Sequence, residues 1–456
     1  MLCEQKRFLT SSFNSYALLS TFGLMTYKET LAYLYEQLPM FSRVGAAAYK
    51  KDLHNTIELC EALGNPQHKF KSIHVAGTNG KGSTCHMLAA ILQEAGFKTG
   101  LYTSPHIKEF GERIRINGKM IDEQYVVNFV KRTRSLTAQV EPSFFELTVA
   151  MAFDYFAKEE IDIAVIETGL GGRLDSTNVI TPILSIITNI GYDHMNLLGK
   201  TLPEIAWQKA GIIKHNIPAI IGEMIPATRN VFVQEANEKE AVLHFVQSRY
   251  MVEYIEPTGN FLFCNVKDMQ TNTTEKLQLD LNGIYQAKNV STVLCAVEQL
   301  RLDGYNIDQV ALHDALAKVK ELTGMRGRWE VIQNHPTIIL DVAHNADGIK
   351  QVLFQLQNMG ANAALHFVLG FVNDKDVAQV LELFPDNASY YFTNAHIPRA
   401  LQHIELKEMA SIKNLKGDSY DDVNQAIAHA KANAAPEDII VVCGSFFIIG
   451  EIEEGG

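Results

Sequence analysis

Short apolar runs alternate with segments of helical spacing along much of this 456-residue chain. The runs at 73–76, 98–103, 161–167 and 183–189 are rich in aliphatic and β-branched residues, as buried strands are. Between them, segments such as 144–156 repeat apolar residues at the spacing of one helix face. This alternation predicts a doubly wound, mainly parallel α/β sheet, in which ligands bind at the carboxyl ends of the strands.

Residues 230–281 break this pattern. They contain three short segments in which apolar and polar residues alternate, at 250–255, 261–266 and 276–281. Alternation with a period of two is typical of half-buried strands. We therefore expect an antiparallel insertion over this part of the chain.

The turn after the run at 73–76 carries the most informative motif. Its residues are Gly77, Thr78, Asn79, Gly80, Lys81, Gly82 and Ser83. Glycines let backbone N–H groups surround an anion, the lysine reaches the β- and γ-phosphates, and the serine hydroxyl can hold Mg²⁺. The glycine spacing departs from the common P-loop, and an ordinary glycine-rich turn is the alternative. We expect a nucleoside triphosphate to bind here.

Other polar residues should reach the same edge of the sheet, including the segment 104–106. Glu167 ends one strand before a glycine-rich turn, which makes it the natural second Mg²⁺ ligand, although a turn-capping glutamate is the alternative. His194 follows the next strand, with Asp193 as an equal candidate, and a packed or solvated histidine is the simpler interpretation. For Lys209, composition alone predicts a solvated helix lysine.

A second set of strand–helix units follows a glycine-rich joint at 324–328. Its first strand leads into Asp341 and His344. The joint carries Arg326 and Arg328, and an arginine fork there could grip phosphate oxygens as the second unit closes. Ordinary surface charge is the alternative for these residues.

We therefore expect three parts. Residues 25–325 form a P-loop domain that binds ATP, and residues 326–456 form a smaller Rossmann-like α/β domain. Residues 1–24 are an extension that is either disordered or precedes the true start at Met25. A signal peptide is the less favoured interpretation of the extension, because its centre is too polar.

Composition and charge narrow the class of protein. The net charge of −12 argues weakly against a nucleic-acid surface. Six scattered cysteines without paired spacing favour reduced thiols over disulfides or a zinc site. No apolar run approaches the length of a membrane span. We expect a cytoplasmic protein that binds neither nucleic acid nor membrane.

Taken together, these motifs resemble the folylpolyglutamate synthase/dihydrofolate synthase family of the Mur ligase superfamily. The resemblance covers nearly the whole chain from Met25. Its most specific pieces, in the order of the family, are HVAGTNGKGS (74–83), TSPH (103–106), ERIR (112–115), ETGLGGRLDSTN (167–178), GYDH (191–194), KAGI (209–212), RGR (326–328) and DVAHN (341–345). The family converts a carboxylate into an acyl phosphate with ATP, and the amine of glutamate then attacks it. The resemblance thus implies a ligase that adds L-glutamate to dihydropteroate, to folates, or to both.

The resemblance also implies roles for individual residues. Those expected to contact the nucleotide are Gly77 to Ser83, Asn289 with Gln286 nearby, Arg328 and Asp341. The catalytic set is Lys81, His194, Lys209, Arg328, Asp341 and His344. The ligands for two Mg²⁺ ions are Ser83, Glu167, His194 and Lys209, the last as a carbamate formed with CO₂. The pterin and glutamate contacts are Ser104, Pro105, His106, Asp175, Ser176, Thr177, Asn178, His344 and Ser445.

The resemblance further implies a monovalent cation and a monomeric enzyme. Three positions depart mildly from the usual pattern, with Ser83 where threonine is also common, Ser176 in place of alanine and Gln208 in place of glutamate. The glycine-rich loop at 370–376 departs further, because its core is shifted, and no contacts are assigned to it.

Three rival classes explain less of the chain. A P-loop switch or transport ATPase leaves the segments 104–106 and 167–178 without a role. A dinucleotide-binding oxidoreductase needs a G-x-G-x-x-G turn after a strand, which the second unit lacks. A Mur peptidoglycan ligase carries a separate amino-terminal domain, and the roughly fifty residues between Met25 and Gly77 are too few for one.

Overall fold

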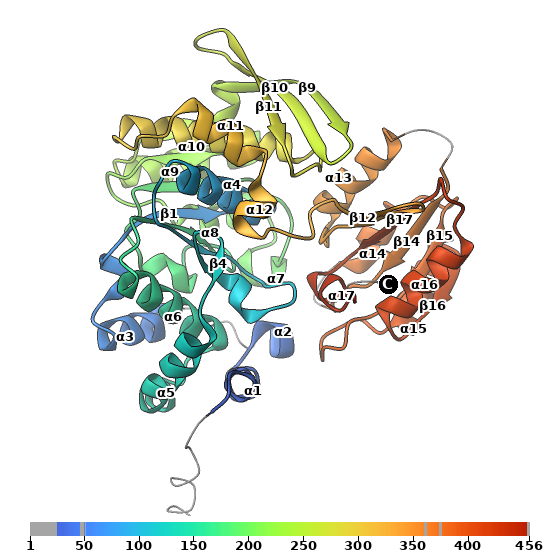
Figure 1. The fold of residues 1–456 in the computed structure, drawn as a ribbon, viewed down its shortest axis with the longest axis horizontal. Helices are drawn as coiled ribbons and strands as arrows, with labels where there is room; N and C mark the ends of the chain where they lie inside the picture. The colour runs from blue at the N-terminus through green and yellow to red at the C-terminus, as the bar shows by residue number, and fades with distance from the viewer. Residues whose placement is uncertain (1–24, 46–49, 51, 360–362, 374–375, 454–456) are drawn as a thin grey trace, which may run out of the picture.

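The computed structural model describes residues 25–45, 50, 52–359, 363–373 and 376–453, so the predicted extension at 1–24 lies outside it. Two lobes lie side by side (Figure 1). The larger contains the blue-to-yellow part of the ribbon, and the smaller contains the orange-to-red part. Among the described residues, no helix has the length and apolar character needed to cross a membrane.

An eight-stranded sheet forms the core of the larger lobe. Its spatial order is β4 (Lys119–Met120), β3 (Ile114–Ile116), β2 (Thr99–Tyr102), β5 (Ile163–Glu167), β1 (Lys71–Ala76), β6 (Leu184–Ile187), β7 (Ala219–Ile221) and β8 (Leu243–Phe245). The strands from β2 to β8 pair in parallel, whereas β3 and β4 add an antiparallel edge. The predicted mainly parallel sheet is confirmed. Because β1 is central, its loop lies between the ends of β5 and β6.

Helices cover both faces of this sheet, because alternate residues of each strand point to opposite sides. Ile73 and Val75 of β1 pack in one apolar cluster, and Ala76 packs in another. The helices of the first face are α4 (Lys81–Glu94), α10 (Gln286–Leu302), α11 (Gln309–Leu316) and α12 (Val319–Thr323). Those of the second face include α1 (Tyr27–Gln37), α3 (His54–Ala62), α5 (Glu123–Val140), α6 (Phe144–Lys158), α8 (Leu202–Ala210) and α9 (Pro226–Glu238).

The predicted insertion is confirmed in part. The strands β9 (Tyr250–Thr258), β10 (Phe261–Asp268) and β11 (Thr273–Leu279) form a separate antiparallel sheet. The expectation was wrong for residues 230–245, because they contain most of α9 and the parallel strand β8. Phe232 and Ala236 are buried at helical spacing in the core of the large lobe, which fixes this segment as a helix.

The smaller lobe is a six-stranded sheet covered on both faces by apolar clusters. Its order is β12 (Glu330–Asn334), β13 (Thr337–Leu340), β17 (Ile439–Cys443), β14 (Leu365–Leu369), β15 (Ser389–Phe392) and β16 (Gly417–Ser419). The strands are parallel except for β12, which pairs antiparallel with β13. Its helices are α13 (Ala346–Gln357), α14 (Val377–Leu381), α15 (His403–Ile412), α16 (Val423–Asn433) and α17 (Phe446–Gly450). We propose a domain boundary between residues 325 and 326, within the link from α12 to β12.

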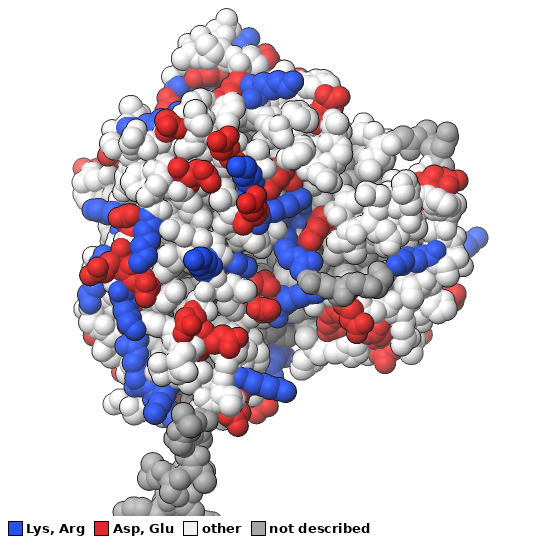
Figure 2. Space-filling view, in the orientation of Figure 1, with Lys and Arg blue, Asp and Glu red and all other residues white. Residues whose placement is uncertain are grey.

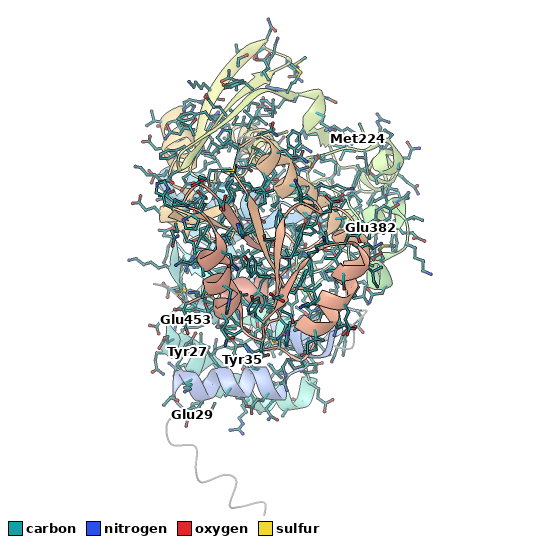
Figure 3. All side chains as sticks on the ribbon, turned by 90° about the vertical axis from the view of Figure 1, so that its right-hand side faces the viewer. Tyr27, Glu29, Tyr35, Met224, Glu382 and Glu453 are labelled. Atoms are coloured by element: carbon teal, nitrogen blue, oxygen red, sulfur yellow. The ribbon has the colours of Figure 1, made fainter. Side chains whose placement is uncertain are left out.

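Two further views locate the remaining features. Figure 3 looks onto the smaller lobe and shows α1, marked by Tyr27, Glu29 and Tyr35, at the opposite end of the molecule from the three-stranded sheet. On the face drawn in Figure 2, acidic and basic side chains are interspersed. The short helices α2 (Phe41–Val44) and α7 (Met195–Leu198) lie beside the seam between the lobes.

Candidate active site

A cavity of about 810 Å³ lies between the lobes and is lined by residues from both. The predicted site residues that line it are Gly77, Thr78, Asn79, Gly80, Lys81, Gly82, Ser83, Ser104, Pro105, His106, Glu167, Asp175, Ser176, His194, Lys209, Asn289, Arg328, Asp341, His344 and Ser445. Thr177 and Asn178 are not part of its lining. The loops that follow β1, β5 and β6 therefore converge with the loops that follow β13 and β17.

The loop between β1 and α4 is shaped by two glycines in backbone conformations that disfavour side chains. Gly77 has φ +156°, and a Cβ built on it would lie 1.8 Å from Thr188 Oγ1. Gly80 has φ +82°, and its Cβ would lie 2.4 Å from Asn289 Oδ1. Any larger residue would push the loop away from these neighbours. The N-terminus of α4 follows at once, which suits the binding of an anion.

Two lysines from different helices meet at this loop. Lys81 Nζ donates to the carbonyl oxygens of Gly77 (3.1 Å) and Thr78 (3.3 Å). Lys209 Nζ, at the end of α8, donates to the same Gly77 carbonyl at 2.8 Å. Lys209 is 3% exposed, so the expectation of a solvated lysine from composition was wrong. Lys209 lies near the end of the helix Leu202–Ala210, and its side chain lines the cavity.

Ser83 is held by the first turn of α10. Gln286 Nε2 donates to Ser83 Oγ at 3.1 Å, and Gln286 Oε1 accepts from Asn289 Nδ2 at 2.8 Å. Both residues come from the first turn of α10, which begins at Gln286. The first turn of α10 therefore positions the Ser83 hydroxyl through Gln286 and packs against Gly80 of the phosphate loop through Asn289.

Glu167 ends β5 at the same edge of the sheet. Its carboxylate accepts the backbone N–H of Ser104 at 3.2 Å and lies beside the start of α4, where a Cβ on Gly82 would be 3.8 Å from Oε2. Burial raises the pKa of Glu167, and Lys81 and the Ser104 N–H oppose that rise. A buried carboxylate beside cationic side chains is a candidate ligand for a metal ion.

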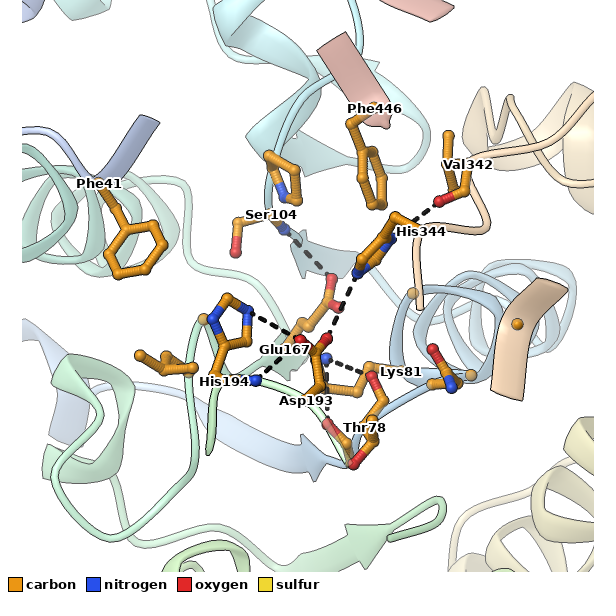
Figure 4. Close-up of a pocket in the computed structure, with 18 of the residues that line it drawn as sticks. Phe41, Thr78, Lys81, Ser104, Glu167, Asp193, His194, Val342, His344 and Phe446 are labelled. Carbon is orange, nitrogen blue, oxygen red and sulfur yellow. Dashed lines mark hydrogen bonds and ion pairs between the residues drawn. The ribbon is translucent and has the colours of Figure 1, made fainter. Parts of the chain in front are cut away.

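Asp193, His194 and His344 form a group across the two lobes (Figure 4). His194 has φ +49° and lies with its Nε2 3.8 Å from Asp193 Oδ1. His344 Nε2 approaches Asp193 Oδ2 at 3.4 Å, and its Nδ1 lies 2.9 Å from the Val342 carbonyl. Phe41 packs edge-on against the His194 ring. Asp193, considered as an equal to His194 from the sequence, is the residue that joins the two histidines.

The smaller lobe contributes Arg328 and Asp341. A Cβ on Gly82 would lie 3.6 Å from an Arg328 nitrogen, which places the guanidinium at the start of α4. Asp341 is buried and accepts hydrogen bonds from the Tyr285 hydroxyl (2.6 Å) and from the backbone N–H of Trp329 (2.9 Å). Burial raises the pKa of Asp341, which the Tyr285 hydroxyl and Arg328 oppose.

Ser104, Pro105 and His106 also line the cavity, with Ser104 next to Glu167. Arg113 Nε donates to His106 Nδ1 at 2.7 Å, and burial together with this arginine lowers the pKa of His106 well below its usual value. His106 is therefore neutral near pH 7. Aromatic side chains of Phe144 and Phe145 line the same region, which suits a flat apolar ligand.

The predicted substrate segment 175–178 is used mainly to shape its own loop. Asp175 accepts the backbone N–H groups of Leu170 (2.7 Å) and Thr177 (3.0 Å). Asn178 donates to the carbonyls of Arg173 (3.0 Å) and Gly211 (3.1 Å). Asp175 and Ser176 line the cavity, whereas Thr177 and Asn178 do not, so a direct substrate contact is best supported for the first two.

Sequence reasoning gave no role to two residues that bridge the lobes, Tyr285 and Asn345. Asn345 caps α13 and exchanges amide hydrogen bonds with Asn79 of the phosphate loop, at 3.0 and 3.2 Å. The position of Asn345 at the end of the DVAHN motif could have indicated its role from the sequence. Tyr285 lies in a turn without a motif, so nothing in the sequence indicated its role.

The donor set of the cavity fits Mg²⁺ only partly. Ser83 and Glu167 offer the oxygen atoms that this ion prefers. His194 offers nitrogen, and Lys209 offers an amine that becomes an oxygen donor only as a carbamate. Within the described ranges, no three His, Cys, Asp or Glu side chains converge as a metal cluster. Mg²⁺ often takes one or two carboxylates and fills its shell with phosphate and water, which is compatible with this set.

Comparisons with known proteins agree with this geometry. Residues 75–297 match the Mur ligase middle domain, and residues 327–446 match the Mur ligase glutamate ligase domain. The dihydrofolate synthase/folylpolyglutamate synthase of Bacillus subtilis is 34% identical, over 89% of this chain and 95% of that protein. A structure of FolC from Escherichia coli in complex with DHPP and ADP has a TM-score of 0.81 at 29% identity, covering 93% of this chain and 96% of that one.

A folylpolyglutamate synthase from Mycobacterium tuberculosis, complexed with ADP and AMPPCP, has a TM-score of 0.82 at 30% identity and covers 93% of this chain and 98% of that one. Similarity therefore extends over both lobes and the cavity between them. The chain belongs to the dihydrofolate synthase/folylpolyglutamate synthase family of Mur ligases.

Proposed function

We propose that this protein is an ATP-dependent ligase that joins L-glutamate to both dihydropteroate and folates. The observation that carries the proposal is a single cavity in which a phosphate loop faces Arg328 and His344 of the other lobe. Family membership supports the reaction class, and the solved FolC complex with DHPP and ADP supports a pterin and a nucleotide as ligands.

The reaction would proceed in two substitutions. A carboxylate oxygen of the pterin substrate bonds to the γ-phosphorus of ATP, and the bond from that phosphorus to the β–γ bridging oxygen breaks, releasing ADP. The free α-amine of glutamate then attacks the acyl carbon, phosphate leaves, and the new amide nitrogen loses a proton. Such chemistry depends on holding the reactants in place and stabilising charge on the phosphoryl group.

The residues of this chain can supply that stabilisation. Lys81 is the first residue of α4, and Arg328 reaches the start of this helix from the other lobe. Their positive charges would balance charge on the β- and γ-phosphates. Ser104, His106 and Ser176, which line the same cavity, would hold the pterin substrate. His344 and Ser445 lie on the small-lobe side, where they would meet glutamate.

We propose further that Ser83 and Glu167 hold Mg²⁺, with His194 near a second ion. Mg²⁺ would neutralise phosphate charge. Lys209 would serve as a ligand after its amine combines with CO₂ to give a carbamate and a proton, because the carbamate presents oxygen atoms. The burial of Lys209 beside the Gly77 carbonyl supports a fixed position for such a ligand. A monovalent cation is also proposed, on the resemblance alone.

We also propose a cytoplasmic monomer. The described cysteines are free and buried, which suits a reducing compartment. Light scattering after gel filtration tests the monomer directly.

The deciding experiment measures ADP release with Mg-ATP and L-glutamate, in parallel with dihydropteroate, with tetrahydrofolate and with neither. We expect release that requires glutamate and occurs with either pterin. Release with one pterin alone would assign a single activity. Release without any pterin would instead favour a P-loop ATPase.

A further inference from the structure

The helix α13 joins the small lobe to the nucleotide side of the cavity at two points. Its N-cap residue Asn345 bonds with Asn79 of the phosphate loop and donates to Asp193 Oδ2 at 3.4 Å. Its last turn carries Gln355, which lies about 15 Å further along the helix axis. Figure 1 shows α13 on the side of the small lobe that faces the large one. A helix fixed at both ends can position parts of the opposite lobe.

Gln355 forms the second point of contact. Its side chain is 1% exposed. Oε1 accepts the backbone N–H of Ile284 at 2.8 Å, and Nε2 donates to the backbone carbonyl of Asn282 at 3.0 Å. The side-chain amide therefore bonds to one N–H and one carbonyl of the large-lobe backbone, as a backbone peptide group would. A buried amide with both functions bonded holds its partners closely, because breaking either bond leaves a buried polar group unpaired.

The segment that Gln355 holds leads directly into the nucleotide site. Tyr285 follows it and bonds to Asp341, and Gln286 bonds to Ser83 Oγ at 3.1 Å. Asn289, one turn later, lies against Gly80 of the phosphate loop. A shift of residues 282–284 would therefore move the side chains that support the loop.

We propose that Gln355 is a positioning residue for the nucleotide, acting from the small lobe on the first turn of α10. It sets where Gln286 and Asn289 stand relative to the phosphate loop when the lobes are together. The pterin end of the cavity is formed by other segments, so the effect should be confined to the nucleotide. The kinetic part of this inference rests on the proposed ligase function, whereas its binding part does not.

The test replaces Gln355 by methionine, which keeps the volume of the side chain and removes both hydrogen-bonding groups. The matched control is Gln357→Met, an exposed glutamine on the same helix. Calorimetry measures the Kd for ADP, and steady-state assays measure KM for ATP and for dihydropteroate. Both hydrogen bonds of the side chain are lost, but only part of their energy reaches the nucleotide. We therefore expect Gln355→Met to raise the ADP Kd and the ATP KM about tenfold. The KM for dihydropteroate should stay within about twofold of the control, near the limit that such assays resolve.

Two results would overturn the proposal. One is an ADP Kd equal to that of the Gln357→Met control. The other is an equal rise in both KM values, which would indicate general loosening of the lobes. If Gln355→Met does not fold, Gln355→Asn takes its place, because its shorter amide cannot reach both backbone groups. A wild-type protein without pterin-dependent ADP release would defeat the ligase proposal, while ADP affinity would still decide the role of Gln355.

Discussion

Two loops that follow neighbouring strands of the large sheet use their polar groups in opposite ways. The loop after β1 is built from glycines that pack closely on Thr188 and Asn289, and its backbone and Lys81 line the cavity. The N–H groups of Thr78 and Asn79 bond to Asn189. The loop after β5 is held by its own side chains, chiefly Asp175. A motif can thus combine residues that meet a ligand with residues that shape the backbone, and the two kinds should respond differently to substitution.

The loop after β5 rests on a buried polar chain. His74 of β1 lies with Nε2 2.8 Å from Thr177 Oγ1, and that hydroxyl donates to Asp175 Oδ1. Because the hydroxyl hydrogen goes to the carboxylate, His74 must donate from Nε2. Burial lowers the pKa of His74 to about 3, so the ring is neutral at ordinary pH. These residues belong to the support of the loop.

The largest effect is expected for Lys209→Ala, on the phosphate-loop side of the comparison. We expect the rate of pterin-dependent ADP release to fall on the order of 10³-fold, because the proposed carbamate ligand of Mg²⁺ is lost. The free energy of unfolding in urea should change little by comparison. Lys200→Ala, at an exposed position before α8, is the control. Equal rates in the variant and the parent would remove Lys209 from the site.

Arg328→Ala should have the next largest effect. Removing the guanidinium at the start of α4 should lower kcat/KM for ATP on the order of 10²-fold, while the Kd of dihydropteroate stays unchanged. Arg326→Ala is the matched control, since that arginine pairs with Glu330 at 3.2 Å and does not line the cavity. If both variants lose activity alike, the joint itself and not the contact with phosphate is responsible.

The sequence predicted the first of these loops better than the second. Glycines, a lysine and a serine after a buried strand specify an anion site through local geometry, and the structure places all of them at the cavity. The segment 175–178 is equally polar, and its hydrogen-bond partners are far apart in sequence, as His74 and Gly211 are. Periodicity does not reveal such partners.

The same limit explains other differences between prediction and structure. The burial of Lys209 depends on how α8 packs beneath the loop, and a helical pattern with one lysine looks like a solvated face. The helix at 226–238 was missed because its polar residues outnumber the few apolar ones, such as Phe232, that pack in the core. The edge strand β12 was not predicted either, since its residues alternate between partly buried and exposed positions without a strong apolar run.

Asp175→Ala tests the support role of the second loop. Removing the acceptor of two backbone N–H groups should lower the free energy of unfolding by about 2 kcal/mol. Ser176→Ala is the informative partner, because Ser176 lines the cavity without these bonds. We expect it to leave stability unchanged and to raise the KM for dihydropteroate a few-fold, of the order of one weak hydrogen bond. Urea unfolding and initial rates on both variants would separate the roles, and the reverse pattern would refute the comparison.

The smallest effect concerns His74 and depends on pH. The pKa of His74 is about 3 in the folded protein, and its ordinary value is 6.5. Between these values, His74 is protonated in the unfolded chain and neutral in the folded chain. The free energy of unfolding should therefore fall as pH drops from 6.5 to 5, approaching about 1.4 kcal/mol per pH unit for this histidine at the lower end. Buried carboxyls such as Asp175 have raised pKa values and act in the opposite direction, so the wild type alone does not isolate His74.

The difference between the wild type and His74→Gln isolates it, because glutamine can donate to Thr177 and does not titrate. Its unfolding free energy should fall less steeply with decreasing pH, while His86, whose burial lowers its pKa to about 3, titrates in both proteins and cancels. Urea unfolding at pH 7, 6 and 5 gives the two slopes. Parallel curves would mean that His74 titrates alike in the folded and unfolded chains. The hydrogen bonds among His74, Thr177 and Asp175 would then be open to water, and they would not support the loop after β5 as the comparison with the loop after β1 requires.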